Sequence, residues 1–205
     1  CCSPAITANS HASEGDGAGR GRTAQAGRRH AMTNRMDILL VGLNHKTAPV
    51  EVRECLGFVG HDVDAALERL QRIAVLQEGL LLSTCNRVEV LATTTDHRRA
   101  VEEITAFLAE GDRVPTEQLG ASLYVHRGDA AVRHVFRVAA SLDSMVVGEP
   151  QILGQLKEAY RRATERKSSG VILNRLLHRA FFVAKRIRTE TGIGDHAVSI
   201  SYAAI

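Results

Sequence analysis

The hydrophobic pattern becomes regular at Asp37 and predicts strands and helices in the order β-α-β-β-α-β up to about residue 127. Short apolar runs bounded by turn-forming residues predict four strands, namely DILLVGL (37–43), LLLS (80–83), RVEVLAT (87–93) and SLYVHR (122–127). Apolar residues three and four apart predict helices at about 62–77 and 96–109, with a shorter helix near 51–55. This order favours an α+β fold with a ferredoxin-like, split βαβ sheet.

Two of the predicted helices have an aspartate at their start, and the chain becomes mainly helical after residue 128. Asp62 and Asp129 are the expected N-caps. The apolar positions of these two helices are Val63, Ala66, Leu67, Leu70, Ile73 and Ala74 in the first, and Val132, Val135, Phe136 and Ala139 in the second. Pro150 suits the first position of a further helix, and Gly192 is expected to end the last one, which begins near Val171. The final HAVSISYAAI is apolar and stops as if inside an element.

The first 35 residues differ in composition from the rest of the chain. They are rich in Gly, Ala, Ser and Arg and lack any apolar period, so they are predicted to be a disordered N-terminal extension. A transit peptide and a mis-assigned start both fit this composition. Four cysteines, without C-x-x-C spacing, predict reduced thiols in a cytosol-like compartment. No run approaches the roughly 18 apolar residues of a membrane span, so we expect a soluble chain.

Charge is distributed unevenly along the sequence. Residues 36–156 carry eleven basic and seventeen acidic side chains, whereas residues 157–190 carry ten basic and three acidic ones. An acidic body followed by a basic helical segment predicts a surface that attracts a polyanion.

Cys85 lies in STCNRVEV, where an apolar strand runs into a polar turn. A cysteine that only fills space prefers apolar surroundings, but here its neighbours are a hydroxyl, an amide and a guanidinium. Arg87 is a cationic neighbour of the kind that activates a thiol as a nucleophile, and its planar fork also suits bidentate recognition of a carboxylate. An idle loop cysteine and a surface ion pair are the alternatives, and position alone does not decide between them.

Other candidate residues lie in the helical part. His134 falls off the face formed by Val132, Val135 and Phe136, so it is a candidate general acid or base that points into a cleft; a solvated helix residue is the alternative. Gln151 and Gln155 lie four apart near a helix N-terminus, where two amides can read a polar ligand. GIGDHA at 192–197 matches a dinucleotide motif but follows a helix instead of a strand, and we reject it.

Four of these stretches, in this order, resemble the N-terminal part of glutamyl-tRNA reductases. They are GLNHKTAPVEVRE, LLSTCNRVEV, AASLDSMVVGEPQILGQLKEAY and AKRIRTETGIG, and the resemblance extends from about Asp37 to the end of the chain. It implies a catalytic domain over 36–150 and a helical linker over 151–205, leading to an NADPH-binding Rossmann domain beyond Ile205. Residues 1–35 fall outside it.

The resemblance also implies an activity. The family reduces glutamyl-tRNA with NADPH to glutamate-1-semialdehyde, the first step of the five-carbon route to tetrapyrroles, so Cys85 would hold the glutamyl group as a thioester and His134 would be required for activity. The residues implied to bind the glutamyl substrate are Thr84, Cys85, Asn86, Arg87, Ser144, Glu149, Pro150, Gln151 and Gln155. Arg87 would hold the glutamate side-chain carboxylate.

Further expectations follow from the same resemblance. The full-length protein would be a homodimer with glutamyl-tRNA as its substrate and an aminomutase as a downstream partner, in the cytoplasm, or in the plastid stroma if residues 1–35 are a transit peptide. No metal is expected, and this chain alone would lack hydride transfer. Two rival functions remain at this point: a Cys-His acyl-ester hydrolase, and a non-catalytic RNA-binding module.

Overall fold

The computed structural model describes residues 36–58, 61–110 and 116–194. The predicted disorder over 1–35 and the apolar segment 196–205 lie outside these residues. The described elements are β1 (Asp37–Asn44), α1 (Val50–Leu56), α2 (His61–Gln71), β2 (Leu76–Ser83), β3 (Arg87–Thr94), α3 (His97–Ala109), α4 (Thr116–Ser122), β4 (Tyr124–Arg127), α5 (Asp129–Ala139), α6 (Gln151–Glu165) and α7 (Val171–Glu190), followed by a 3-10 turn (Gly192–Gly194).

The four strands form one antiparallel sheet in the order β2-β3-β1-β4. Strands β1 and β2 therefore run in the same direction with β3 between them, and β3 and β4 run in the same direction with β1 between them. Each of these two parallel pairs is connected through helices. The predicted α+β class is confirmed.

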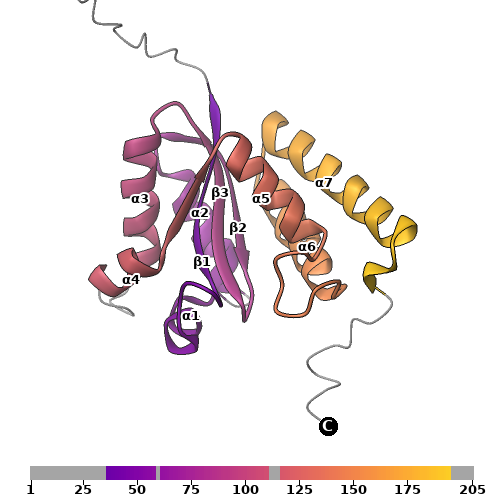
Figure 1. Ribbon diagram of the computed structural model, residues 1–205. Helices are drawn as coiled ribbons and strands as arrows, with labels where there is room; N and C mark the ends of the chain where they lie inside the picture. The colour runs from indigo at the N-terminus through magenta and orange to yellow at the C-terminus, as the bar shows by residue number, and fades with distance from the viewer. Residues whose placement is uncertain (1–35, 59–60, 111–115, 195–205) are drawn as a thin grey trace, which may run out of the picture. The chain divides into compact units, whose positions relative to one another are not determined.

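Helices cover both faces of the sheet (Figure 1). Alternate residues of β1 point to opposite faces. Leu39, Val41 and Leu43 join a core built with α1, α2, α3 and α4, whereas Leu40 joins a second core with α5, α6 and α7. Because both faces are covered, every residue of β3 is buried, including its charged residues. The predicted boundary at residue 150 stays a prediction, and α5, α6 and α7 share one core.

Helix α2 is shorter than predicted and β2 is longer. The helix ends at Gln71 instead of 77, and β2 begins at Leu76 instead of Leu80. Turn hydrogen bonds after Gln71 keep Ile73 and Leu76 partly buried against the core, while Ala74 is exposed. Apolar residues therefore keep a helix-like spacing beyond the end of the helix, and this spacing made the predicted helix too long. Asp62 lies within the first turn and is not the N-cap, because the helix begins at His61.

The region around β4 also differs from the prediction. Helix α4 was not predicted, since it is short and Leu119 is its one fully buried apolar side chain among the residues whose burial is described. Strand β4 begins at Tyr124, two residues later than expected. Asp129 is the first residue of α5, and its N-cap is Gly128, whose φ of 51° favours glycine. The predicted helices α6 and α7 are confirmed, but Pro150 is the N-cap of α6 and not its first residue, because the helix begins at Gln151.

None of the described helices is long and apolar enough to cross a membrane.

A buried carboxylate on β2 caps the N-terminus of α7. The Glu78 side chain accepts hydrogen bonds from the backbone N–H groups of Gly170 (3.0 Å), Ile172 (3.0 Å) and Leu173 (2.7 Å). A Cβ on Gly170 would lie 2.8 Å from the carboxylate carbon of Glu78, so a side chain there would displace the capping carboxylate. The cap supplies acceptors for N–H groups that a helix start leaves unpaired, and it joins the sheet to α7.

We expect Glu78→Ala to lower the free energy of unfolding by about 2 kcal/mol, because it leaves these N–H groups without their charged acceptor. Glu78→Gln retains one oxygen and should lose less. Denaturant unfolding followed by circular dichroism measures both. The neighbouring, exposed Gln77→Ala is the control, and equal losses in Glu78→Ala and Gln77→Ala would contradict the capping role.

Candidate active site

The turn between β2 and β3 presents Cys85 at one end of the sheet. Thr84 shapes this turn: its Oγ1 accepts hydrogen bonds from the backbone N–H groups of Asn86 and Arg87, both at 3.1 Å, and its own N–H donates to the Arg87 carbonyl at 2.8 Å. Cys85 is therefore held at the tip of a closed turn, where its side chain is exposed. The hydroxyl that precedes the cysteine has a structural role in fixing the turn.

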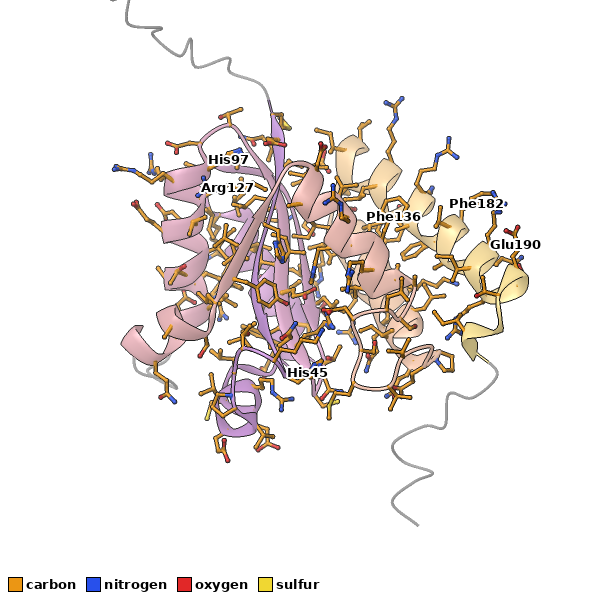
Figure 2. All side chains as sticks on the ribbon, viewed as in Figure 1. His45, His97, Arg127, Phe136, Phe182 and Glu190 are labelled. Atoms are coloured by element: carbon orange, nitrogen blue, oxygen red, sulfur yellow. The ribbon has the colours of Figure 1, made fainter. Side chains whose placement is uncertain are left out.

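Arg53 of α1 attaches this turn to the neighbouring loop. Its Nη1 donates to the Cys85 carbonyl at 2.6 Å and to Asn86 Oδ1 at 3.2 Å, and its Nε donates to the Ala48 carbonyl at 3.2 Å. The backbone N–H of His45, which Figure 2 places at this end of the sheet, donates to the Asn86 carbonyl at 3.0 Å. The guanidinium that contacts the cysteine turn is therefore that of Arg53, and not that of Arg87 as we expected.

The Arg87 side chain points into the protein and is 1% exposed. As the first residue of β3 it shares a face with Glu89, toward the helices α5 to α7. Its Nη1 lies 2.8 Å from Glu89 Oε1, and its Nη2 lies 3.3 Å from Asp143 Oδ2 and also donates to the Asp143 carbonyl. The alternative of a surface ion pair is wrong, because the pair is buried.

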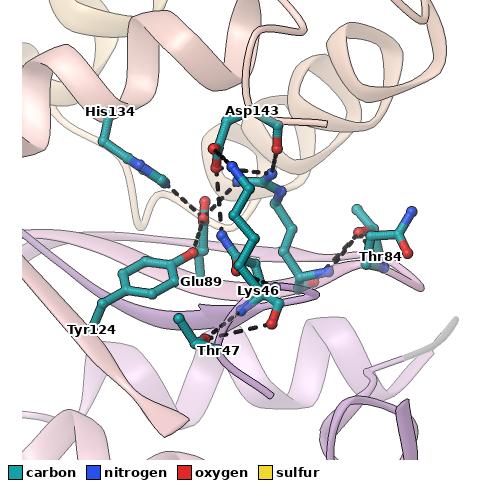
Figure 3. Close-up of polar contacts among 10 residues, drawn as sticks. Lys46, Thr47, Thr84, Glu89, Tyr124, His134 and Asp143 are labelled. Atoms are coloured by element: carbon teal, nitrogen blue, oxygen red, sulfur yellow. Dashed lines mark hydrogen bonds and ion pairs between the residues drawn. The ribbon is translucent and has the colours of Figure 1, made fainter. Parts of the chain in front are cut away.

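Glu89 is the centre of this cluster (Figure 3). Its Oε1 accepts hydrogen bonds from Arg87, from the Tyr124 hydroxyl of β4 and from His134 Nε2 of α5, the last at 2.8 Å. An ionised carboxylate has no hydrogen to donate, so His134 carries its hydrogen on Nε2. The rings of Tyr124, His126 and His134 pack against one another, with centroids 4.7 to 5.5 Å apart.

His134 lies on the buried face of α5, contrary to prediction. That face consists of Ala131, His134, Val135 and Val138, whereas Val132 and Phe136 are only partly buried. A face at positions i, i+3, i+4 and i+7 includes the histidine, and it turns the ring toward Glu89. The hydrogen bond found for this ring leads to Glu89, and none leads to Cys85.

Asp143 connects the loop between α5 and α6 to the ends of β1 and β3. Besides Arg87, it accepts hydrogen bonds from Lys46 Nζ and from Asn44 Nδ2, the latter at 3.4 Å. Figure 3 shows Lys46 and Asp143 meeting above the sheet. Lys46 is half exposed, so the site combines one buried cation and one cation that solvent reaches.

Burial and charge act against each other on these groups. Burial disfavours the charged form of Glu89, but the hydrogen bond from His134 and the charge of Arg87 outweigh it and hold the pKa of Glu89 below its usual value. Burial likewise opposes ionisation of Asp143, and the hydrogen bond from Lys46 and the charge of Arg87 lower its pKa. Burial and the charge of Glu89 raise the pKa of Tyr124, so its hydroxyl remains a donor.

Gly42 of β1 makes room for Glu89. It is paired with Glu89 on one side and with Tyr124 on the other. A Cβ at this position would lie 2.5 Å from the Val88 carbonyl oxygen and 2.8 Å from both Cα and Cγ of Glu89. The absence of a side chain on β1 lets Glu89 and Tyr124 meet across the strand.

A pocket of about 610 Å³ opens beside Cys85. Of the predicted site residues, Thr84, Cys85 and Gln155 line it, together with apolar side chains from α2, β2, α6 and the segment after α1. Arg87 and His134 do not line it. Thr84, Cys85 and Gln155 thus belong to the pocket, whereas Arg87 and His134 belong to the buried ionic cluster around Glu89.

The remaining predicted residues lie on the loop before α6 and at its start. Ser144 has a buried hydroxyl without a hydrogen-bond partner in the structure. Glu149 is buried and its carbonyl accepts a hydrogen bond from Ser141 Oγ, whereas Pro150 and Gln151 are exposed. This loop is held at Gly148, whose carbonyl accepts a hydrogen bond from Arg188 of α7 at 2.6 Å. The structure gives no direct contact between these residues and Cys85.

Several site residues were missed by sequence reasoning. Lys46, Arg53, Glu89 and Asp143 all fall within the stretches that carry the family resemblance, yet nothing in their spacing indicated that they would meet. Tyr124 lies outside those stretches. In the sequence it is only a tyrosine in a short predicted strand, and tyrosines are common in any sheet, so nothing singled it out.

The basic segment forms α6 and α7, and much of its charge is paired locally. Among the described pairs are Arg161 with Glu158 and Glu165, Arg166 with Asp64 and Glu68, and Arg186 with Glu190. Pairing reduces the attraction for a polyanion, and contact with RNA stays a prediction. Within the described part of the chain, no group of His, Cys, Asp or Glu residues could hold a metal ion.

Fold and site together define an α+β domain with an exposed cysteine turn beside a buried ionic cluster, and comparison with known proteins gives its family. Residues 41–191 match the family model described as glutamyl-tRNAGlu reductase, N-terminal domain. The chain belongs to this family.

Individual relatives agree. The chain is 59% identical over 170 residues to the glutamyl-tRNA reductase of Desulfatibacillum aliphaticivorans and 55% identical to that of Pelobacter propionicus; each alignment covers 83% of this chain and 39% of the relative. The solved glutamyl-tRNA reductase from Methanopyrus kandleri matches with a TM-score of 0.67 and 39% identity, over 82% of this chain and 38% of that one. The chain thus spans about two fifths of the length of these relatives.

We expect Arg87→Leu to lower the free energy of unfolding by about 3 to 5 kcal/mol, because it leaves the buried Glu89 without its arginine and removes one of the two cations that contact Asp143. Denaturant unfolding measures the loss. Arg98→Leu is the matched control, since Arg98 pairs with Glu102 at a fully exposed position and its removal should change little. A loss in Arg87→Leu no larger than in the control would contradict the energetic role of the cluster.

Stability should fall in acid because of Glu89 and Asp143. Their pKa values are lower in the folded chain than the unfolded values of about 4.3 and 3.9, so their contribution is complete above about pH 5 and is lost as the pH falls through the folded values. Free energies of unfolding measured from pH 7 to pH 3 should decline less steeply below pH 4 in Glu89→Gln. Identical slopes would rule out Glu89 as a source of the acid sensitivity.

Proposed function

We propose that this chain is the part of a glutamyl-tRNA reductase that takes the glutamyl group from its carrier RNA. The thiolate sulfur of Cys85 attacks the carbonyl carbon of the aminoacyl ester. A carbon–sulfur bond forms, the carbon–oxygen bond to the ribose breaks, and the ribose oxygen leaves with a proton. The observation that carries the proposal is the exposed Cys85 at the tip of a turn fixed by Thr84 and Arg53, between a pocket and a buried ionic cluster.

Arg87 remains our proposed ligand for the side-chain carboxylate of the glutamyl group. In the structure Arg87 and Lys46 both contact Asp143, so a carboxylate already lies between two cations. We propose that the substrate carboxylate exchanges with that of Asp143, whose 3.3 Å ion pair with Arg87 is longer than the 2.8 Å pair with Glu89. The residues proposed to surround the glutamyl group, from family likeness, are Thr84, Asn86, Ser144, Glu149, Pro150, Gln151 and Gln155.

His134 is proposed to act by positioning. Its Nε2 holds Glu89, and Glu89 holds the guanidinium of Arg87. No hydrogen bond joins His134 to Cys85, and His134 does not line the pocket beside Cys85, which weighs against the Cys-His pair of a thiol hydrolase. We therefore propose that His134 orients Arg87, through Glu89, for binding the substrate carboxylate. This proposal replaces the role as a general acid or base that we inferred from the sequence.

The NADPH of the family does not fit the residues described here. Within 36–58, 61–110 and 116–194, no strand enters a helix through a glycine-rich turn of the dinucleotide-binding kind. We propose that the cofactor, which supplies the hydride, binds in the part of the relatives that this chain does not match. No step through NADPH is derived from this chain.

The remaining proposals concern organisation and context. We interpret the split βαβ sheet as ferredoxin-like, residues 36–150 as the catalytic domain, and residues 151–205 as the connection toward a nucleotide-binding domain. Glutamate-1-semialdehyde for tetrapyrrole synthesis is the proposed product, with homodimer formation and an aminomutase partner expected for the full-length protein. Location in the cytoplasm stays a prediction, and the relatives named above lend no support to a plastid transit peptide.

Incubation with glutamyl-tRNA should add one glutamyl group to the chain at Cys85, as seen by intact-mass spectrometry and peptide mapping. Cys85→Ser should show no thioester, because its hydroxyl is a much weaker nucleophile. Cys55→Ser is the matched control, since Cys55 of α1 is the other exposed free cysteine among the described residues, and its variant should keep the adduct.

Three outcomes would contradict the proposal. An adduct on Cys55 or on another side chain would remove Cys85 as the nucleophile. Rapid release of free glutamate without a detectable adduct would favour a hydrolase. Binding of the RNA with no acyl transfer, unaffected by alkylation of Cys85, would favour a non-catalytic RNA-binding module.

A further inference from the structure

The pocket beside Cys85 is a second compartment, distinct from the buried ionic cluster. Thr84 and Cys85 line it, but Arg87, Glu89, Asp143 and His134 do not. Its volume of about 610 Å³ lies within the range of roughly 300–1,000 Å³ for small-molecule sites. The cysteine turn is therefore shared between the buried ionic cluster and a pocket whose lining residues are mostly uncharged.

The walls of the pocket suit a flat, neutral group with polar edges. Phe58, Val63, Leu81 and Ala159 supply apolar surface, and the Phe58 backbone N–H is bound to Ser83 Oγ at 2.9 Å, which keeps that segment against the pocket. Gln155, which we place beside the glutamyl group, also lines this pocket, so its amide, which can both donate and accept, lies where the acyl group and its leaving group meet. Apolar walls with a few polar groups are typical of sites for nucleobases and similar rings.

Charge on the rim is balanced. Arg53 and Arg162 face the pocket, and so do Glu54 and Glu158. Arg162 Nε is itself bonded to Glu158 at 2.9 Å, and Arg53 is bonded to the cysteine turn. A glutamyl carboxylate would lose hydration against the apolar walls of the pocket, whereas Arg87 and Lys46 already hold one carboxylate, that of Asp143, between them. The pocket therefore favours a neutral occupant over the acidic acyl group.

Chemistry restricts what that occupant is. For acyl transfer, the ester carbon must reach the sulfur of Cys85, so the ribose on the other side of the ester lies within one or two bonds of the same point. The ribose carries the terminal base of the RNA. With the carboxylate of the acyl group directed to Arg87, the base is the part of the substrate that remains to be placed beside Cys85.

We propose that this pocket binds the terminal nucleoside of the carrier RNA while its acyl group moves to Cys85. The inference rests on the proposed function and adds to it a site for the leaving group. Stacking of a base contributes about 1–3 kcal/mol, which corresponds to about fivefold to more than a hundredfold in reactivity toward the RNA ester.

The test fills the pocket and compares three acyl donors. Val63→Trp and Ala159→Phe place bulk in it from α2 and α6, and Val171→Trp adds the same ring at an exposed position of α7 as the control. The donors are glutamyl-tRNA, the glutamyl ester of adenosine, and a glutamyl thioester of a small thiol without a nucleoside. Both pocket variants should form the Cys85 adduct about fivefold or more slowly from the first two donors, and within about twofold of the unmodified chain from the third.

Two results would overturn the inference. Equal slowing with all three donors would show that the pocket holds the glutamyl group, and unchanged rates with all three would show that the reaction does not use it. Because bulky substitutions can unfold a protein, free adenosine provides a second readout on the unmodified chain: it should slow acylation from glutamyl-tRNA and not from the small thioester. Absence of any adduct in the unmodified chain with all donors would instead defeat the proposed function, and the inference with it.

Discussion

The ion pair between Arg87 and Glu89 is the interaction on which the site depends. Two charges buried beneath helices on one face of a sheet are tolerated only when their hydrogen-bonding groups are satisfied. Glu89 meets this condition by accepting from β3, β4 and α5 at once, and Arg87 meets it by adding Asp143 from a distant loop. The requirement to satisfy one carboxylate thus determines where a strand, a helix and a loop lie relative to one another.

The cysteine turn is fixed by hydrogen bonds other than those of the buried ionic cluster. Thr84 closes it internally, and Arg53 of α1 holds its carbonyl and amide oxygens from outside. Arg87 links the two arrangements, because its backbone N–H belongs to the turn and its side chain belongs to the buried cluster. A nucleophile held in this way needs little rearrangement before it meets a substrate, which is the condition for efficient acyl transfer.

Much of the fold was predictable because its signals are local. Strands β1 and β3 and helices α3, α6 and α7 show clear apolar runs or periods, and Asp96 is an ordinary N-cap. Helix α4 lacks such a period, and the turn after Gln71 continues the helical spacing of apolar residues without being helical. For the site, Cys85 and its turn were identifiable, but the partners of Arg87 were not. Glu89 lies two residues away, Asp143 fifty-six residues away, and only the folded sheet brings both to one guanidinium.

Gly42 shows how a residue without a side chain can be as constrained as the nucleophile. It lies in the middle of a central strand, where glycine is normally disfavoured, and the space above it is occupied by Glu89. Replacement by even the smallest side chain would push on the backbone of β3 and on the carboxylate that three other groups share. In a library of random variants, position 42 should therefore be as depleted among functional clones as position 85, although one residue performs chemistry and the other only leaves room for it.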